Sequence, residues 1–162
     1  MVGGSPATAA LAAAFGAALP DLPAILKAAA LWPRRSSMTR KQFCHRLFFE
    51  GRSRKLDVAL HSLVLSGAAL GISSTVRGPE SRATALALGW VGHNTVDLLT
   101  HADHTRPQLW PLSEFRWQSP ISYHNPKKGG RLFTAAEFTA LALSVLAMAA
   151  EVSRGAVARR EA

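Results

Sequence analysis

Residues 82–101 have the sequence RATALALGWVGHNTVDLLTH, and this segment decides the kind of fold that we expect. Small and aliphatic residues fill it, and Ser81 stands directly before it, at the position where a serine can cap a helix. Within it, His93, Asp97 and His101 follow one another at intervals of four residues. Because an α-helix turns about 100° per residue, side chains at this spacing lie on one face. The segment therefore predicts a helix with one polar row.

Three more blocks rich in alanine and leucine accompany this segment, at about residues 5–19, 57–74 and 132–151. Prolines end the first block, and a further apolar stretch at 24–32 follows it. Runs of β-branched and aromatic residues are few, so the fold class that we expect is all-α, as a four-helix up-down bundle. Asp57 is expected to cap the second block. We expect one helical domain over residues 1–152 and a charged tail over 153–162.

The first connection, residues 33–56, is strongly basic and is expected to contain a short amphipathic helix from about Thr39 to Glu50. It holds eight Lys and Arg residues, and the third connection, residues 102–131, holds five. Only Arg77 and Arg82 lie near the second connection. If the four blocks cross a bilayer in alternating directions, this asymmetry satisfies the positive-inside rule, with both basic connections cytoplasmic. The sequence therefore predicts a multi-pass protein of a cytoplasmic membrane.

Two alternatives to a membrane protein follow from the same composition. The apolar cores of the blocks are near the lower length limit for a membrane span, and the mean hydropathy is only +0.09. A soluble four-helix bundle with alanine-rich contacts fits these values as well. The net charge of +9 also suits a soluble module that binds nucleic acid. No nucleic-acid recognition motif is present in the sequence, so we expect membrane lipid and no specific nucleic acid as the partner.

Polar residues from three blocks are expected to meet at one end of the bundle. His93, Asp97 and His101 occupy the end of the third block, His61 lies one turn into the second, and Asp21 follows the first. In an up-down topology these ends lie on the same side. Imidazole and carboxylate groups are common ligands of zinc. We therefore predict that these five residues form a divalent-metal site, with zinc as the first candidate.

The spacing along the predicted row limits how many ligands one ion can take from it. Neighbours are about 6 Å apart along the helix axis and the outer two about 12 Å, so only adjacent side chains reach one ion. Asp97 lies among Val96, Leu98 and Leu99, where an unpaired carboxylate is costly. The row thus suits two metals, or one metal and a substrate contact.

Several histidines and the cysteine have simpler interpretations. His61 alone could be a hydrogen-bonded core histidine, and Asp21 alone could be a turn residue. His104 would extend the row if the helix continued, whereas His45 and His124 are expected to be peripheral. The single Cys44 excludes an intrachain disulfide and a zinc site built from cysteines.

The order of these motifs resembles that of a known family. The sequence contains Leu19-Pro-Asp21-Leu-Pro23, Leu60-His61-Ser62, Gly92-His93-x-x-x-Asp97-Leu-Leu-Thr-His101, Leu109-Trp-Pro-Leu-Ser113 and Ser119-Pro-Ile-Ser-Tyr123. Over roughly residues 15–125 this arrangement resembles the bacterial membrane-bound, predicted metal-dependent hydrolases, which are described as related to zinc-dependent phospholipase C.

The resemblance implies a helical protein of the bacterial inner membrane with a hydrolytic metal site. Asp21, His61, His93 and Asp97 match its polar positions, with His101 next. We therefore expect a metal-dependent hydrolase that acts on an ester, with a phospholipid phosphoester as the first candidate and Asp97 and His101 acting in catalysis. The alternative is a non-catalytic integral membrane protein in which the His/Asp residues are structural or sense a metal.

Overall fold

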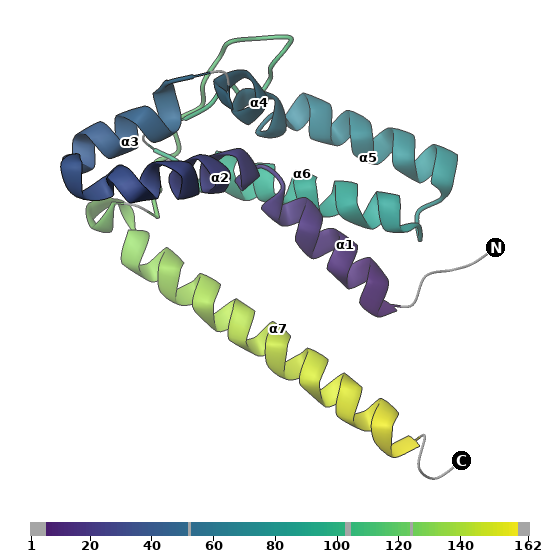
Figure 1. Ribbon diagram of the computed structural model, residues 1–162. Coiled ribbons are helices and arrows are strands. Elements are labelled where there is room, and N and C mark those ends of the chain that lie inside the picture. Colours follow the sequence, from purple (N-terminus) through teal and green to yellow (C-terminus); the bar gives the residue numbers. More distant parts are fainter. Residues whose placement is uncertain (1–5, 52, 103–104, 124, 159–162) are drawn as a thin grey trace. The chain divides into compact units, whose positions relative to one another are not determined.

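The computed structural model describes residues 6–51, 53–102, 105–123 and 125–158 (Figure 1). Within this part of the chain the regular structure is helical, apart from one isolated β-bridge. The α-helices are α1 (Pro6–Ala18), α2 (Leu22–Leu31), α3 (Arg40–Phe49), α4 (Ser53–Leu60), α5 (Leu63–Arg77), α6 (Arg82–Thr100) and α7 (Gly130–Ala158), and the 3-10 helices are η1 (Trp32–Ser37) and η2 (Pro126–Lys128). The predicted all-α class is confirmed.

The chain divides into two compact units. The first contains Met1–Leu99 and Asp103–Gln118, and the second contains Thr100–Ala102 and Ser119–Ala162. The first unit therefore holds α1 to α5 and nearly all of α6, whereas α7 belongs to the second. The expected start of a tail at residue 153 falls inside α7.

The second apolar block is broken where the sequence predicted one continuous helix. Helix α4 begins at Ser53 and ends at Leu60, and two residues separate it from α5, which begins at Leu63. The Ser62 hydroxyl accepts a hydrogen bond from the Leu65 amide at 3.1 Å and so caps α5. The expectation that Asp57 caps this block is wrong, because Asp57 lies inside α4. The break leaves His61 between two helices.

Two predicted helix starts are confirmed. The Ser81 hydroxyl accepts a hydrogen bond from the Thr84 amide at 3.2 Å, and α6 follows at the next residue. Thr39 and Gln42 form a reciprocal capping box at the start of α3, in the first basic connection. Local sequence signals were sufficient at both positions.

Helices α1 and α6 contact each other through two glycines. A Cβ atom added to Gly16 would lie 1.9 Å from the Leu86 carbonyl oxygen, and one added to Gly89 would lie 2.0 Å from the Ala13 carbonyl oxygen. The two backbones are thus closer than any side chain would permit, as in helix pairs that pack through small residues. This contact sets the position of α1, and hence of the turn at Asp21, against α6.

Helix α6 also holds the break between α4 and α5. The buried Asn94 amide donates to the Leu60 carbonyl, the Ser62 carbonyl and the Ser66 hydroxyl, each at 3.1 Å. The Trp90 indole donates to the same Leu60 carbonyl. Carbonyls at the end of a helix lack partners within that helix, and these donors satisfy the Leu60 carbonyl at the end of α4. His61, between Leu60 and Ser62, is therefore fixed against α6.

The loop of residues 105–118 closes over the same break. The Leu63 amide donates to the Gln108 carbonyl at 2.8 Å, and the Ser62 hydroxyl donates to the Trp110 carbonyl. Arg106 forms a two-pronged ion pair with Asp57, at 2.8 and 3.1 Å. The break is thus bonded to the loop on one side and to α6 on the other.

The second unit is organised around a short loop before α7. The Tyr123 amide donates to the Thr100 carbonyl at 3.3 Å, and the Ser119 amide donates to the His101 carbonyl at 2.9 Å. Gly130 begins α7 where a Cβ atom would lie 2.6 Å from the Tyr123 carbonyl oxygen. A glycine is required there by the close approach of the loop.

Among the described residues, no single helix has both the length and the hydropathy of a membrane span. Two pairs of consecutive helices, each bent at a short break, reach the length and hydropathy of a span when taken together. They are α1 with Leu22–Ser37, bent by 61°, and Arg54–Leu60 with α5, bent by 55°.

Candidate metal centre

Four side chains from three separate parts of the first unit converge, and we call them the His/Asp cluster. Asp21 comes from the turn between α1 and α2, and His61 comes from the break between α4 and α5. His93 and Asp97 lie one turn apart on α6. The contact of α1 with α6 through Gly16 and Gly89 positions the turn that carries Asp21. The Asn94 hydrogen bonds position the break that carries His61, and α6 itself carries His93 and Asp97.

The distances within the cluster fit those between ligands of one ion. His93 Nε2 lies 3.4 Å from an Asp97 oxygen, and His61 Nε2 lies 3.6 Å from the same oxygen. The Asp21 carboxylate lies 3.8 Å from His61 Nε2. Ligand atoms of a tetrahedral zinc site, with bonds of about 2.0–2.1 Å, are about 3.3–3.4 Å apart. Asp21, His61 and His93 each offer a ligand atom within 4.8 Å of the other two, so these three could hold one ion after the side chains move closer together, with Asp97 beside both imidazoles.

Both Nε2 atoms are buried and lack a hydrogen-bond partner among the described residues. These are His61 Nε2 and His93 Nε2. An unsatisfied buried polar atom costs about 1–3 kcal/mol, and native structures contain few of them. Their rings meet edge to face, with centroids 5.6 Å apart. Each nitrogen lies 3.4–3.8 Å from a carboxylate oxygen, and a cation bound between them would satisfy both kinds of group.

The other nitrogen of His61 fixes which form of the ring is present. His61 Nδ1 lies 2.7 Å from the Asp57 carbonyl oxygen, which can only accept a hydrogen bond. Nδ1 therefore carries a proton, and a neutral ring presents the Nε2 lone pair to the cluster. Metal-binding histidines are usually oriented by such a bond to a carbonyl or carboxylate. Asp57 is in turn held by Arg106.

The cluster is closed on the histidine side and open at Asp21. The His61 side chain is 3% exposed, whereas that of Asp21 is 53% exposed. His93 and Asp97 are intermediate. Structural zinc sites are closed by protein ligands, whereas catalytic sites keep a position for water or substrate. With three of these side chains as ligands, the exposed edge at Asp21 leaves the fourth position for water or substrate.

Electrostatics favour the ionised form of the acid in the turn. The neighbouring His61 imidazole lowers the pKa of the Asp21 carboxyl, and His93 and Arg106 act in the same direction against the opposing effect of burial. Although burial acts to lower it, the pKa of the Arg106 guanidinium is raised, because Asp57 pairs with it. A negative Asp21 is the form that binds a cation.

The structure brings together four of the five predicted ligands. The fifth, His101, follows the end of α6 in the second unit, where its ring packs edge-on against Tyr123 with centroids 4.9 Å apart. Its part in catalysis or metal binding stays a prediction. His45, expected to be peripheral, lies on exposed α3 and pairs with Glu50 at 3.1 Å. His104 and His124 lie outside the described residues.

Three supporting residues were not predicted from the sequence. Asn94 follows His93 directly, but only its burial shows that it anchors the helix break. Asp57 and Arg106, which orient His61, are 49 residues apart in the chain. The one available signal was Asp57 four residues before His61, a spacing that places both on one side of a helix.

In the comparisons with known proteins, no family model, no curated protein and no solved structure matches this chain.

Proposed function

We propose that this protein is a metal-dependent hydrolase whose ion, zinc as first candidate, is held by Asp21, His61, His93 and Asp97. The observation that carries the proposal is the pair of buried imidazole nitrogens without hydrogen-bond partners, 3.4–3.8 Å from two carboxylates. Two histidines and two carboxylates form a ligand set common to zinc and similar divalent ions.

The chemistry follows from the open edge of the cluster. A zinc ion lowers the pKa of its bound water to about 7 and so supplies a hydroxide nucleophile at neutral pH. The cluster histidines would hold the ion, and Asp57 and Arg106 keep His61 in the tautomer that could bind it. Substrate would approach past the exposed Asp21. An ester is the proposed substrate, with a phosphoester of a membrane lipid as first candidate.

Exposed apolar side chains support a membrane location. Large aliphatic and aromatic residues are exposed on α1, α5, α6 and α7, among them Leu11, Phe15, Ile72, Val76, Leu88, Leu99, Leu132, Phe138 and Leu146. Exposed apolar surface on this scale marks contact with a membrane or a protein partner. We propose that the chain is bound to a membrane as the predicted up-down bundle, with its basic connections on the cytoplasmic side.

Metal content and hydrolysis measured together test the proposal. The full chain is purified in detergent, stripped with a chelator and reloaded with zinc. Bound zinc is then counted, and turnover of bis(p-nitrophenyl) phosphate and of phospholipid vesicles is measured. Wild type should bind zinc and hydrolyse at least one substrate, and Asp97→Ala should lose both. His45→Ala, which changes a histidine outside the cluster, should match wild type. Near-zero zinc in every form would refute the proposal.

One observation also fits a non-catalytic role. The cluster pairs imidazoles with carboxylates at distances that give electrostatic attraction even without a metal. A structural or metal-sensing cluster predicts that Asp97→Ala lowers the melting temperature, while neither wild type nor the variant hydrolyses any ester. Fractionation tests the location separately, since recovery of the chain in the supernatant after mild lysis would contradict membrane binding.

A further inference from the structure

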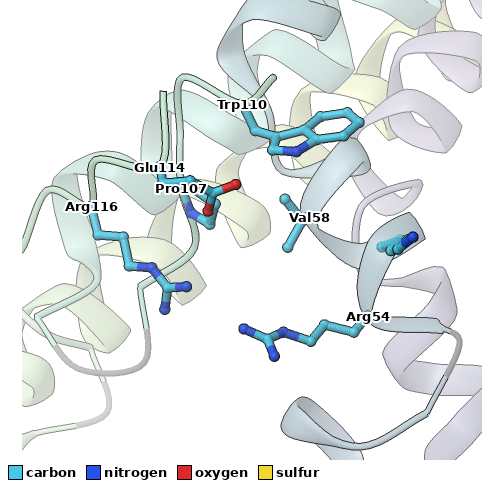
Figure 2. Close-up of a pocket in the computed structure, with 7 residues that line it drawn as sticks. Arg54, Val58, Pro107, Trp110, Glu114 and Arg116 are labelled. Atoms are coloured by element: carbon cyan, nitrogen blue, oxygen red, sulfur yellow. The ribbon is translucent and has the colours of Figure 1, made fainter. Parts of the chain in front are cut away.

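A second feature of the first unit lies between α4 and the loop of residues 105–118. It is a hollow of about 460 Å³ (Figure 2). Three cationic side chains line it, namely Arg54, Lys55 and Arg116. Its remaining wall contains Val58, Pro107, Trp110 and Glu114. Three cations against one carboxylate leave the lining doubly positive.

The two arginines of the hollow extend toward each other, and the Arg116 guanidinium also donates a hydrogen bond to the Thr105 carbonyl at 3.5 Å. Figure 2 shows the guanidinium groups of Arg54 and Arg116 extending from opposite sides toward the middle of the hollow. In the part of the chain that the structure describes, neither the Arg54 nor the Lys55 side chain makes an ion pair or hydrogen bond, and Glu114 pairs with no cation. Like charges that converge repel unless an anion lies between them.

The rest of the lining suits the organic part of a ligand. Trp110 lies along one side of the hollow, and Val58 and Glu114 lie below it in the view of Figure 2. Pro107 is fully buried, so this wall is fixed. Arginine side chains bind phosphate by two parallel hydrogen bonds, and aromatic and aliphatic groups cover apolar carbon.

The hollow and the His/Asp cluster lie along one stripe of α4. Arg54, Val58 and His61 are spaced at i, i+4 and i+7, which places them on the same helix face. The helical hydrogen-bond pattern continues to His61, whose amide donates to the Asp57 carbonyl at 3.1 Å. Seven residues correspond to about 10 Å along the axis. The hollow and the cluster are therefore about 10 Å apart along this helix.

We infer that this hollow binds the phosphate group of a phosphate ester and anchors the substrate of the proposed hydrolase. The inference rests on the proposed function for its catalytic meaning, whereas binding itself needs no metal. Arg54 and Arg116 donate hydrogen bonds to the phosphate from two sides, and Lys55 adds positive charge. The carbon part of the ligand lies against Trp110 and Val58.

Binding to the metal-free full chain in detergent tests the inference. Glycerol 3-phosphate is titrated by calorimetry, and nanodiscs of phosphatidylcholine with and without phosphatidic acid are assayed in parallel. Wild type should bind at least one phosphate monoester. Arg54→Gln and Arg116→Gln should each weaken binding by roughly ten- to a hundredfold, the effect of losing a charged hydrogen bond. Arg34→Gln, on the exposed 3-10 helix η1, makes the same change of charge and should bind like wild type.

Each outcome is decisive. Binding of glycerol 3-phosphate assigns a soluble ester, and binding only to nanodiscs with phosphatidic acid assigns a lipid headgroup; both support the inference. No binding of either probe at millimolar concentration overturns it, as does equal weakening by Arg34→Gln. Zinc counts on the same variants separate the two proposals. Arg54→Gln should bind as much zinc as wild type. If wild type bound phosphate but no zinc, the hydrolase proposal would be refuted and the phosphate site would stand.

Discussion

At the scale of residues, the candidate metal centre depends on two imidazole nitrogens, His61 Nε2 and His93 Nε2. His61 is oriented through Nδ1, which donates to the Asp57 carbonyl, so that Nε2 faces the carboxylates of Asp21 and Asp97. His93 Nε2 is also buried and lies 3.4 Å from the same Asp97 oxygen. The cost of burying polar atoms without hydrogen bonds is what makes a cation the natural occupant.

Replacing His93 by glutamine should remove one ligand while keeping a polar side chain of similar size. Because even residues that only support a ligand change metal affinity by about 10–100-fold, loss of the ligand itself should weaken zinc binding by about a hundredfold or more. Competition with a chromogenic zinc chelator measures this. His45→Gln serves as the control, and equal affinity of the two variants would place the zinc elsewhere.

At the scale of elements, the cluster depends on how closely helices approach. Gly89 contacts the α1 backbone, whereas at Gly92, on the same helix, a Cβ atom would have no described atom within 4 Å apart from its neighbours and the backbone of its own helix. The same substitution should therefore have opposite effects at positions three residues apart. Alanine at position 89 would force the α1 and α6 backbones apart, whereas alanine at position 92 would only remove the conformational freedom of a helical glycine.

Gly89→Ala should lower the free energy of unfolding by about 1–3 kcal/mol, because the added methyl group meets the Ala13 carbonyl. Gly92→Ala should raise it by about 0.5–1 kcal/mol. Thermal or denaturant unfolding in detergent measures both. Gly89→Ala should also bind zinc more weakly, since α1 carries Asp21. If both variants were stabilised, α1 and α6 would not be in contact.

Asn94→Leu tests the hydrogen bonds that hold the break before α5. The change removes the amide that serves the Leu60 and Ser62 carbonyls and the Ser66 hydroxyl, and should cost about 2–3 kcal/mol of unfolding free energy. Thr95→Val, at the next and exposed position, should stay within about 0.5 kcal/mol of wild type. If Asn94→Leu left the free energy of unfolding unchanged, a different contact would have to fix the break.

At the scale of the whole molecule, the sequence predicted the helical class and the four side chains that the structure brings together. Capping residues and periodicity are local, so Ser81 and the row on α6 could be identified. The break at His61 was missed, although Ser62 is a capping residue like Ser81, because apolar residues continue on both sides of it and the break is stabilised by Asn94 and the loop of residues 105–118. Contacts between residues far apart in sequence leave no local signal.

Removing the metal should destabilise the first unit as a whole. An ion bound only by the folded chain adds about 2.7 kcal/mol at a concentration one hundred times its dissociation constant. The melting temperature of wild type should therefore fall with chelator and rise again with zinc. Asp97→Ala should show no zinc-dependent shift, and an equal shift in both would point to unspecific binding.

X-ray absorption at the zinc edge tests the cluster most directly. For the zinc-loaded full chain we predict one ion with imidazole nitrogens and carboxylate oxygens at about 2.0–2.2 Å and no sulfur ligand. The imidazole signal should disappear in the double variant His61→Gln/His93→Gln. An unchanged imidazole signal in that variant, or a wild-type chain that retains no zinc, would contradict a metal centre built from these residues.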